Sequence, residues 1–192
     1  MRLSKKLIGA LLVAVTVPAQ VGRTLKAPVD ISEEFVAGGF MGDGEAGTRF
    51  VQMRAVTGEA ARPGRASGVS TKVTYHPGPQ GWAGVYWQCP PDNWGDKPGI
   101  RIEGATKITF WAAGLKGGEI IEFKAGGIAG RRYQDSFEMS MGKVALTNRW
   151  REYSIPLARQ NLASVLGAFA WIASSADNPD GVSFYLDDIR YR

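Results

Sequence analysis

The sequence has few residues that could support covalent, metal-centred or redox chemistry. Its 192 residues include one cysteine, Cys89, and one histidine, His76. A single cysteine excludes a disulfide within the chain. A catalytic Ser-His-Asp or Cys-His arrangement would need His76, which lies in a His-Pro-Gly turn. The G-x-S-x-G nucleophile motif does not occur, and a zinc site would lack ligands.

Phosphate-binding glycine motifs are also missing, because the Gly-Gly pairs lie among strand and turn residues without a following helix. Two carboxylates can form a glycosidase pair, for example Glu122 with Asp135 or Glu119 with Glu138, but neither pair has a characteristic spacing. The sequence therefore predicts a protein that is not an enzyme. Glycoside cleavage, by a hydrolase or a lyase, is the weakest alternative.

No apolar run reaches the roughly 20 residues that a transmembrane helix needs. The run from Leu7 to Val17 follows Arg2, Lys5 and Lys6 and ends at Val17-Pro18-Ala19, which is the layout of a secretory signal peptide over residues 1–19. An uncleaved membrane anchor is the alternative, and the short run disfavours it. We expect export to the periplasm, the cell surface or the extracellular space, with no stable membrane insertion after cleavage.

The chain also has little excess charge. It contains 23 basic and 18 acidic residues, a net charge of +5, but three of the basic residues lie in the predicted signal peptide. The remaining excess of two is too small to indicate a basic patch for nucleic acid. We therefore expect no nucleic-acid partner.

Turn-rich β-structure is what the sequence does contain. It has 25 glycines and 6 tryptophans, and its hydrophobic content of 44% is ordinary for a globular domain. A polar lead-in over residues 20–34 precedes segments in which apolar and polar residues alternate between turns. Strands are expected at residues 35–43, 50–55, 69–75, 82–88, 107–113, 119–125, 136–141, 150–157, 167–174 and 182–191.

These segments predict an all-β fold, a jelly-roll β-sandwich of about nine to ten antiparallel strands that forms a single domain over residues 35–192. At most one short helix is expected, over residues 158–165. In the strand 82–88, Trp82, Tyr86 and Gln88 share one face, and Val85 and Trp87 share the other. The large aromatics predicted to pack in the core are Trp87, Trp111, Trp150 and Phe169.

Several segments carry a family resemblance: WAGVYWQCPPDNWG, GATKITFWAAGLKGGEIIEFKAGG, LTNRWREYSIPL, LGAFAWIAS and VSFYLDDIRYR. In this order and spacing, from about Phe35 to Arg192, the chain resembles secreted β-jelly-roll proteins related to carbohydrate-binding modules, the galactose-binding-like sandwiches. The resemblance implies the fold, and it implies carbohydrate binding only by analogy.

A sugar ring offers an apolar C–H face to aromatic rings and hydroxyl groups to polar side chains. The segments 92–96 and 131–135 and the strand 119–125 combine such residues. Trp94 could instead cap the end of the sandwich, and Glu122 with Lys124 could be a solvated charge pair. The predicted contacts of a poly- or oligosaccharide are Trp94, Tyr133, Asp135, Arg132, Glu122 and Trp82.

The resemblance also implies a structural calcium ion near the first and last strands. Asp187 or Asp188 matches the position in the last strand, and Glu34 and Asp43 are candidates near the first. Calcium takes six to eight oxygen ligands. A buried carboxylate needs a partner, and an arginine would serve as well as calcium.

A structural or self-assembling extracellular protein without a glycan ligand is the main alternative function. Glycine-broken strand edges and exposed aromatics would permit self-association. Cys89 precedes Pro90-Pro91 in a loop-like stretch, where it is either a partly buried small hydrophobe or the site of an intermolecular disulfide.

Overall fold

The computed structural model describes residues 22–57, 62 and 68–192, so the predicted signal peptide lies outside the described residues. Strands dominate these residues, and two short helices accompany them. In chain order the elements are β1 (Thr24–Lys26), β2 (Val29–Asp30), α1 (Ile31–Glu34), β3 (Val36–Gly42), the 3-10 helix η1 (Asp43–Arg49), β4 (Val51–Val56), β5 (Ser70–Tyr75), β6 (Trp82–Gln88), β7 (Arg101–Glu103), β8 (Lys107–Gly114), β9 (Ile120–Gly126), β10 (Glu138–Ala145), β11 (Arg151–Pro156), β12 (Gly167–Ser174) and β13 (Val182–Tyr191).

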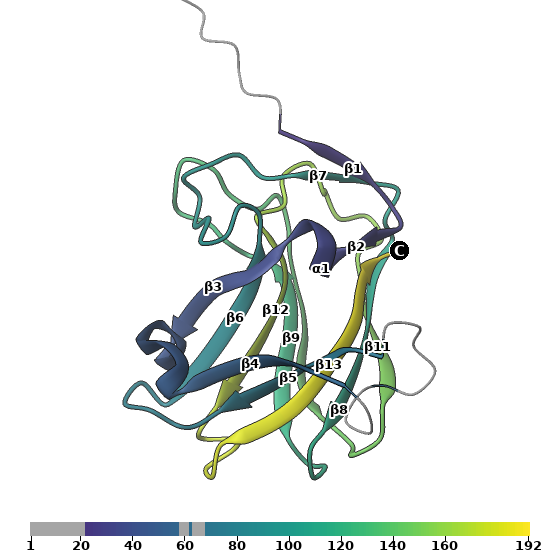
Figure 1. The fold of residues 1–192 in the computed structure, drawn as a ribbon. Coiled ribbons are helices and arrows are strands. Elements are labelled where there is room, and N and C mark those ends of the chain that lie inside the picture. Colours follow the sequence, from purple (N-terminus) through teal and green to yellow (C-terminus); the bar gives the residue numbers. More distant parts are fainter. Residues whose placement is uncertain (1–21, 58–61, 63–67) are drawn as a thin grey trace, which may run out of the picture.

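Two antiparallel sheets form the sandwich (Figure 1). One has the strand order β10-β9-β12-β6-β3, and the other has the order β11-β8-β13-β5-β4, with β2 paired to β13. A small parallel ladder joins β1 to β7. The predicted all-β sandwich with antiparallel sheets is therefore confirmed.

The core lies between the two sheets, because each strand buries alternate residues there. The rings of Phe110 and Phe123 lie 4.6 Å apart, and Phe169 packs against both. Trp87 meets Phe169 edge-on at 5.4 Å and is 4% exposed. The prediction that Trp87 and Phe169 pack in the core is confirmed.

Trp111 and Trp150 occupy a different place from the one predicted. Both are half-buried and lie outside the core, on the outer face of the sheet to which β8 and β13 belong. The guanidinium of Arg62 sits 4.7 Å from the centre of the Trp111 ring, and Trp150 packs against Tyr185 at 6.0 Å. An odd-numbered position in β8 faces outward because Phe110 and Ala112 face the core.

The predicted helix over residues 158–165 is wrong. Leu162 and Val165 are buried, and backbone bonds tie the segment to the residues before and within β7: Ile102 N–H donates to Leu162 O, and Ile100 and Val165 bond each other. The segment therefore satisfies its backbone groups with a neighbouring segment instead of within a helix. In the part of the chain that the structure describes, no helix is long and apolar enough to cross a membrane.

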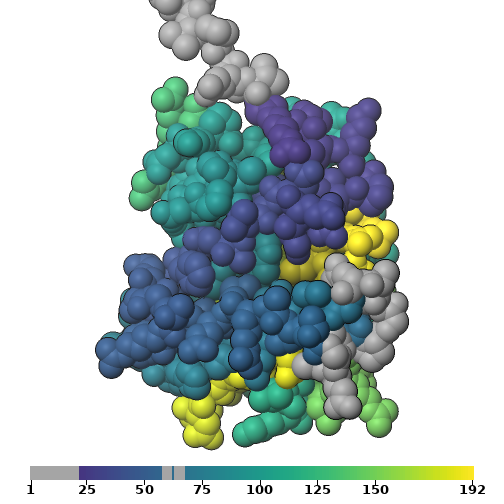
Figure 2. All heavy atoms as spheres, in the orientation of Figure 1, coloured from purple at the N-terminus to yellow at the C-terminus, as the bar shows by residue number. Residues whose placement is uncertain are grey.

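The described part of the lead-in is built into the sandwich. Val29 and Ile31 belong to the core, and β2 pairs with the end of β13. Asp30 caps α1 by accepting a hydrogen bond from the Ser32 N–H at 3.0 Å. Figure 2 shows the amino-terminal segment, in purple, lying against the yellow carboxyl-terminal strand.

Candidate functional site

The outer face of the five-stranded sheet, called the open face below, is formed by alternate residues of its strands. In β6, Val85 and Trp87 belong to the core, whereas Tyr86 belongs to a separate cluster on the other side of the sheet. This confirms the alternation predicted for the strand. Trp82 lies on the same side as Tyr86 and is 37% exposed, so a large part of its ring is available for contact.

Trp94 reaches the open face from the loop between β6 and β7. Its ring meets Tyr86 edge-on at 6.1 Å, and its Nε1–H donates to Asp92 Oδ1 at 2.7 Å. Tyr86 in turn donates its hydroxyl to Gly126 O at 2.8 Å. Trp94 is therefore half-buried and oriented by two neighbours, while part of it remains accessible.

Trp82 and Trp94 line the same hollow, which has a volume of about 460 Å³. The structure thus brings together two predicted sugar contacts that are twelve positions apart in the sequence. Met41 adds an apolar side chain to the lining of this hollow. The polar side chains of the lining are those of Glu45, Asp92 and Arg131. Apolar rings beside carboxylates and a guanidinium are the combination expected for a sugar site.

A second hollow, of about 240 Å³, lies further along the open face. Glu122 of β9 and Ile172 of β12 line it. In the sheet, Ile172 lies between Glu122 and Gly84 of β6, and it pairs with both residues. Lys143 and Asp177 form an ion pair at 2.8 Å on its wall. The predicted contact Glu122 therefore lies on the same face as Trp82 but in a separate hollow.

Hydrogen bonds fix the polar side chains of β9 on this face. Glu122 accepts from the Ser140 hydroxyl at 2.6 Å, and Lys124 pairs with Glu138 at 2.6 Å. Burial alone would lower the pKa of Lys124, but the hydrogen bond and charge of Glu138 raise it above its usual value. Lys124 therefore stays charged across the physiological range, and both side chains are held in place.

Tyr133 and Arg132 lie in the loop between β9 and β10, at the edge of the open face. Like Trp94, Tyr133 packs against the cluster that contains Tyr86, and its N–H donates to Gly95 O at 3.0 Å. The Arg132 guanidinium lies 5.2 Å from the centre of the Tyr133 ring. Tyr133 thus joins this loop to the loop that carries Trp94, and Arg132 is exposed beside Tyr133.

The Asp135 side chain holds that loop in place through hydrogen bonds to the backbone. Its carboxylate accepts hydrogen bonds from the N–H groups of Ile128 at 2.8 Å, Leu166 at 2.6 Å and Gly167 at 3.2 Å. Burial raises its pKa to about 6, although these hydrogen bonds act in the opposite direction. Asp135 therefore anchors the β9–β10 loop to the start of β12 in this structure.

Several residues of the two hollows were missed by reasoning from the sequence. Arg131 and Asp92 stand in the two loops that the sequence singled out, so composition alone could have included them. Met41, Lys143 and Asp177 have no such signal. Their place on the open face depends on how β3, β10 and the β12–β13 turn are arranged around the sheet.

Three of the four predicted calcium ligands pair with arginines. Asp187 and Asp188 both pair with Arg62, at 3.2 and 3.5 Å, and Asp188 also pairs with Arg190 at 2.6 Å. Glu34 pairs with Arg23 at 2.6 Å. Among the described residues, no three His, Cys, Asp or Glu side chains are grouped to hold a metal ion. The four residues therefore do not fit a single calcium site, and calcium binding stays a prediction.

Asp43, the fourth candidate, is 2% exposed and accepts hydrogen bonds from Tyr75 Oη, Gly78 N–H and Gln80 N–H at 2.8–2.9 Å. Burial would raise its pKa, but these donors bring the pKa below its usual value. The ionised carboxylate therefore joins η1 to the β5–β6 turn.

Cys89 is half-buried and packs against the core. Burial raises the pKa of its thiol, which reduces the fraction of reactive thiolate at neutral pH. These observations favour the interpretation of Cys89 as a small hydrophobe over the alternative prediction of self-association through an intermolecular disulfide.

Comparisons with known proteins agree on the fold. No family description and no curated protein matches the sequence. The family 11 carbohydrate-binding module from Clostridium thermocellum, solved in complex with a β-1,3-1,4-mixed-linked tetrasaccharide, is 14% identical and superposes with a TM-score of 0.56, covering 85% of this chain and 93% of that chain.

The family 30 carbohydrate-binding module of the cellulosomal cellulase Cel9D-Cel44B of Clostridium thermocellum is 13% identical, with a TM-score of 0.51 over 82% of this chain and 92% of that chain. An exo-β-agarase is 9% identical, with a TM-score of 0.52 over 85% of this chain and 24% of that enzyme. At these identities the likeness shows the fold alone. The resemblance to carbohydrate-binding modules is therefore confirmed as a shared jelly-roll sandwich.

Proposed function

We propose that this protein is a secreted, non-catalytic carbohydrate-binding protein whose open face binds a poly- or oligosaccharide. The observation that carries the proposal is the placement of Trp82 and Trp94 on one hollow, with Asp92, Glu45 and Arg131 around them. A flat aromatic ring matches the apolar C–H face of a sugar, and carboxylate acceptors and guanidinium donors match its hydroxyl groups.

The two hollows suggest that the ligand is longer than one sugar. Trp82 and Trp94 would stack on one residue of the chain, and Glu122, Lys143 and Asp177 would bond hydroxyl groups of another. The hydrogen bonds and ion pairs that already hold these side chains reduce the entropy lost on binding. A mixed-linked β-glucan is the first ligand to test, because the similar family 11 module was solved with such a tetrasaccharide.

Secretion and the absence of catalysis belong to the same proposal. The layout of residues 1–19 supports export. The carboxylates that line the hollow with the two tryptophans, Asp92 and Glu45, have no sequence motif of a glycosidase beside them. We expect the protein to bind polysaccharide without shortening it, which is checked by sizing the polysaccharide after incubation.

The test is a glycan array together with pull-downs on insoluble polysaccharides. Wild-type protein is compared with Trp94→Ala and with the matched control Trp150→Ala, whose half-buried tryptophan lies on the other sheet. Binding that Trp94→Ala loses and Trp150→Ala keeps supports the open face as the site. If folded wild-type protein binds no glycan, the structural or self-assembling alternative takes the place of this proposal.

A further inference from the structure

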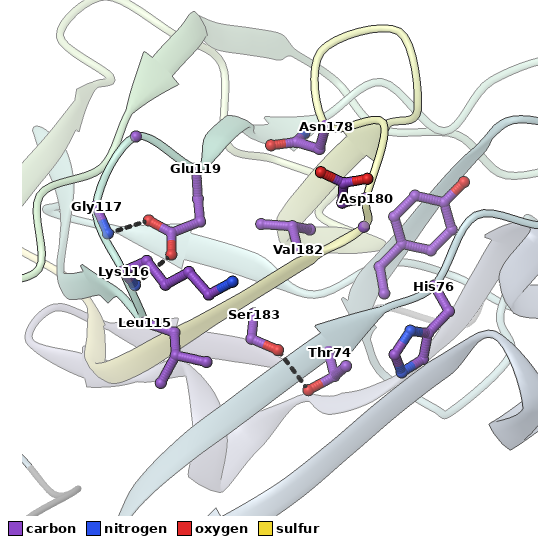
Figure 3. Close-up of a pocket in the computed structure, with 13 residues that line it drawn as sticks. Thr74, His76, Leu115, Lys116, Gly117, Glu119, Asn178, Asp180, Val182 and Ser183 are labelled. Carbon is purple, nitrogen blue, oxygen red and sulfur yellow. Dashed lines mark hydrogen bonds between the residues drawn. The ribbon is translucent and has the colours of Figure 1, made fainter.

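A pocket of about 300 Å³ lies at one end of the sandwich, where the β5–β6, β8–β9 and β12–β13 turns meet (Figure 3). It is separate from the open face. Ser174 and Asp177 line the second hollow of that face, whereas Asn178 and Asp180, further along the chain, line this pocket. The β12–β13 turn therefore stands between two distinct depressions.

Hydrogen bonds hold the walls of the pocket in place. Both carboxylate oxygens of Glu119 accept backbone N–H groups of the β8–β9 turn, from Lys116 at 2.6 Å and Gly117 at 2.9 Å. The Asn178 side chain bonds the N–H and the C=O of Ile120 at 3.0 and 2.9 Å. The pocket is therefore largely formed before any ligand arrives, which is typical of small-molecule sites.

Opposite charges face this pocket without neutralising each other. Among the described residues, neither the Lys116 amine nor the Asp180 carboxylate has a hydrogen-bond or ion-pair partner, unlike the paired Lys143 and Asp177 nearby. Figure 3 shows the two groups on either side of Val182. A bound molecule that carries both an anionic and a hydroxyl group would match both walls.

Apolar and neutral polar groups complete the lining. Val182 is buried at the base, and Leu115 is 44% exposed at the margin. The hydroxyls of Thr74 and Ser183 bond each other at 3.0 Å, and His76 lies beside them (Figure 3). The pocket thus offers apolar contact below and hydrogen-bonding groups around it.

We infer that this pocket binds a hexuronate, an acidic monosaccharide unit, at a second site that is independent of the open face. The carboxylate of the sugar pairs with Lys116, vicinal hydroxyls on the opposite side of the ring donate to Asp180, and the C–H groups rest on Leu115. The volume is at the lower limit for small-molecule pockets, which suits one sugar ring and no more.

The experiment is an NMR titration of the isotope-labelled protein with D-galacturonate, D-glucuronate, neutral D-galactose and acetate. A uronate is expected to shift the amide signals of the residues in the 115–119 and 178–183 turns. Neutral galactose and acetate, each of which lacks one of the two matched groups, are expected to bind at least about tenfold more weakly.

Lys116→Gln and Asp180→Asn each remove one charge at an exposed position and are expected to weaken uronate binding at least about tenfold. The matched control Lys97→Gln, an exposed lysine in the β6–β7 loop, is expected to bind as wild type does. Unshifted signals at saturating uronate, or equal binding of uronate and galactose, would overturn the inference, as would unchanged affinity in Lys116→Gln.

Binding at the end pocket and binding at the open face can be tested separately. The Trp82→Ala variant is expected to lose polysaccharide binding at the open face while the uronate shifts in the end pocket persist. If no polysaccharide binds the open face, the uronate titration still reports on the end pocket directly.

Discussion

The six tryptophans have very different roles in the structure. Trp87 and Trp171 are buried in the core, and Trp111 lies under the guanidinium of Arg62. Trp82 and Trp94 line the hollow of about 460 Å³ on the open face. Alternation within β6 predicted that Trp82 lies on the face opposite Val85 and Trp87, which belong to the core. Nothing in the sequence could place Arg62 over Trp111, because their contact joins distant parts of the chain.

The buried carboxylate of Asp135 is expected to make the free energy of unfolding depend on pH. Its pKa is raised to about 6, mainly by burial, against about 4 in an unfolded chain. Between these values the folded protein holds more protons than the unfolded chain. The contribution of Asp135 to the free energy of unfolding therefore falls as the pH rises from about 4 to 6, by on the order of 1–3 kcal/mol.

The measurement compares urea denaturation of wild type and Asp135→Asn at several pH values between 4 and 6. The difference in unfolding free energy between the two proteins is expected to change with pH in that window, because asparagine does not titrate there. A difference that stays constant from pH 4 to pH 6 would show that the pKa of Asp135 is not raised.

Among the elements, the long strands of the sandwich followed from the sequence, whereas the short strands β1, β2 and β7 and the connections did not. β6, β12 and β13 begin and end where their alternating residues predicted. The segment 158–165 was misassigned because its apolar residues are spaced as in a helix, whereas backbone bonds to the 100–102 segment hold it extended. Lys143 and Asp177 met on the open face because of strand register, which no local pattern reveals.

Two loops border the hollow that Trp82 and Trp94 line, and they approach each other closely at Gly95. It has a φ of +108°, and a Cβ at this position would lie 2.5 Å from Tyr133 O. Gly95→Ala is therefore expected to push the β6–β7 and β9–β10 loops apart, breaking the Tyr133–Gly95 backbone bond. We expect glycan affinity to fall at least about tenfold, as Trp94 and Arg131 shift.

The control for this variant is Gly104→Ala. Gly104 also has a positive φ, +78°, but nothing lies within 4 Å of the added Cβ. Both variants carry the cost of backbone strain, so only Gly95→Ala should change glycan affinity in calorimetric titration. Equal affinities of the two variants would mean that the spacing of the loops does not shape the site.

For the whole molecule, the fold was predictable because ten alternating segments separated by turns leave few architectures. Its contacts with other molecules were less predictable.

Cys89, half-buried and with a raised thiol pKa, is expected to react slowly with a thiol reagent and to form no disulfide-linked dimer. Thiol titration and non-reducing electrophoresis after air oxidation check this, and a covalent dimer that reductant removes would contradict it.

The central claim is that the open face binds carbohydrate through Trp82 and Trp94. The most direct measurement is calorimetric titration of wild type, Trp82→Ala and Trp150→Ala with the strongest glycan from the array, starting with mixed-linked β-glucan oligosaccharides. Because Trp82 is already exposed, its replacement should leave folding intact while glycan affinity falls at least about tenfold, and Trp150→Ala should bind as wild type does. Unchanged affinity in Trp82→Ala, or loss only in Trp150→Ala, would contradict the account.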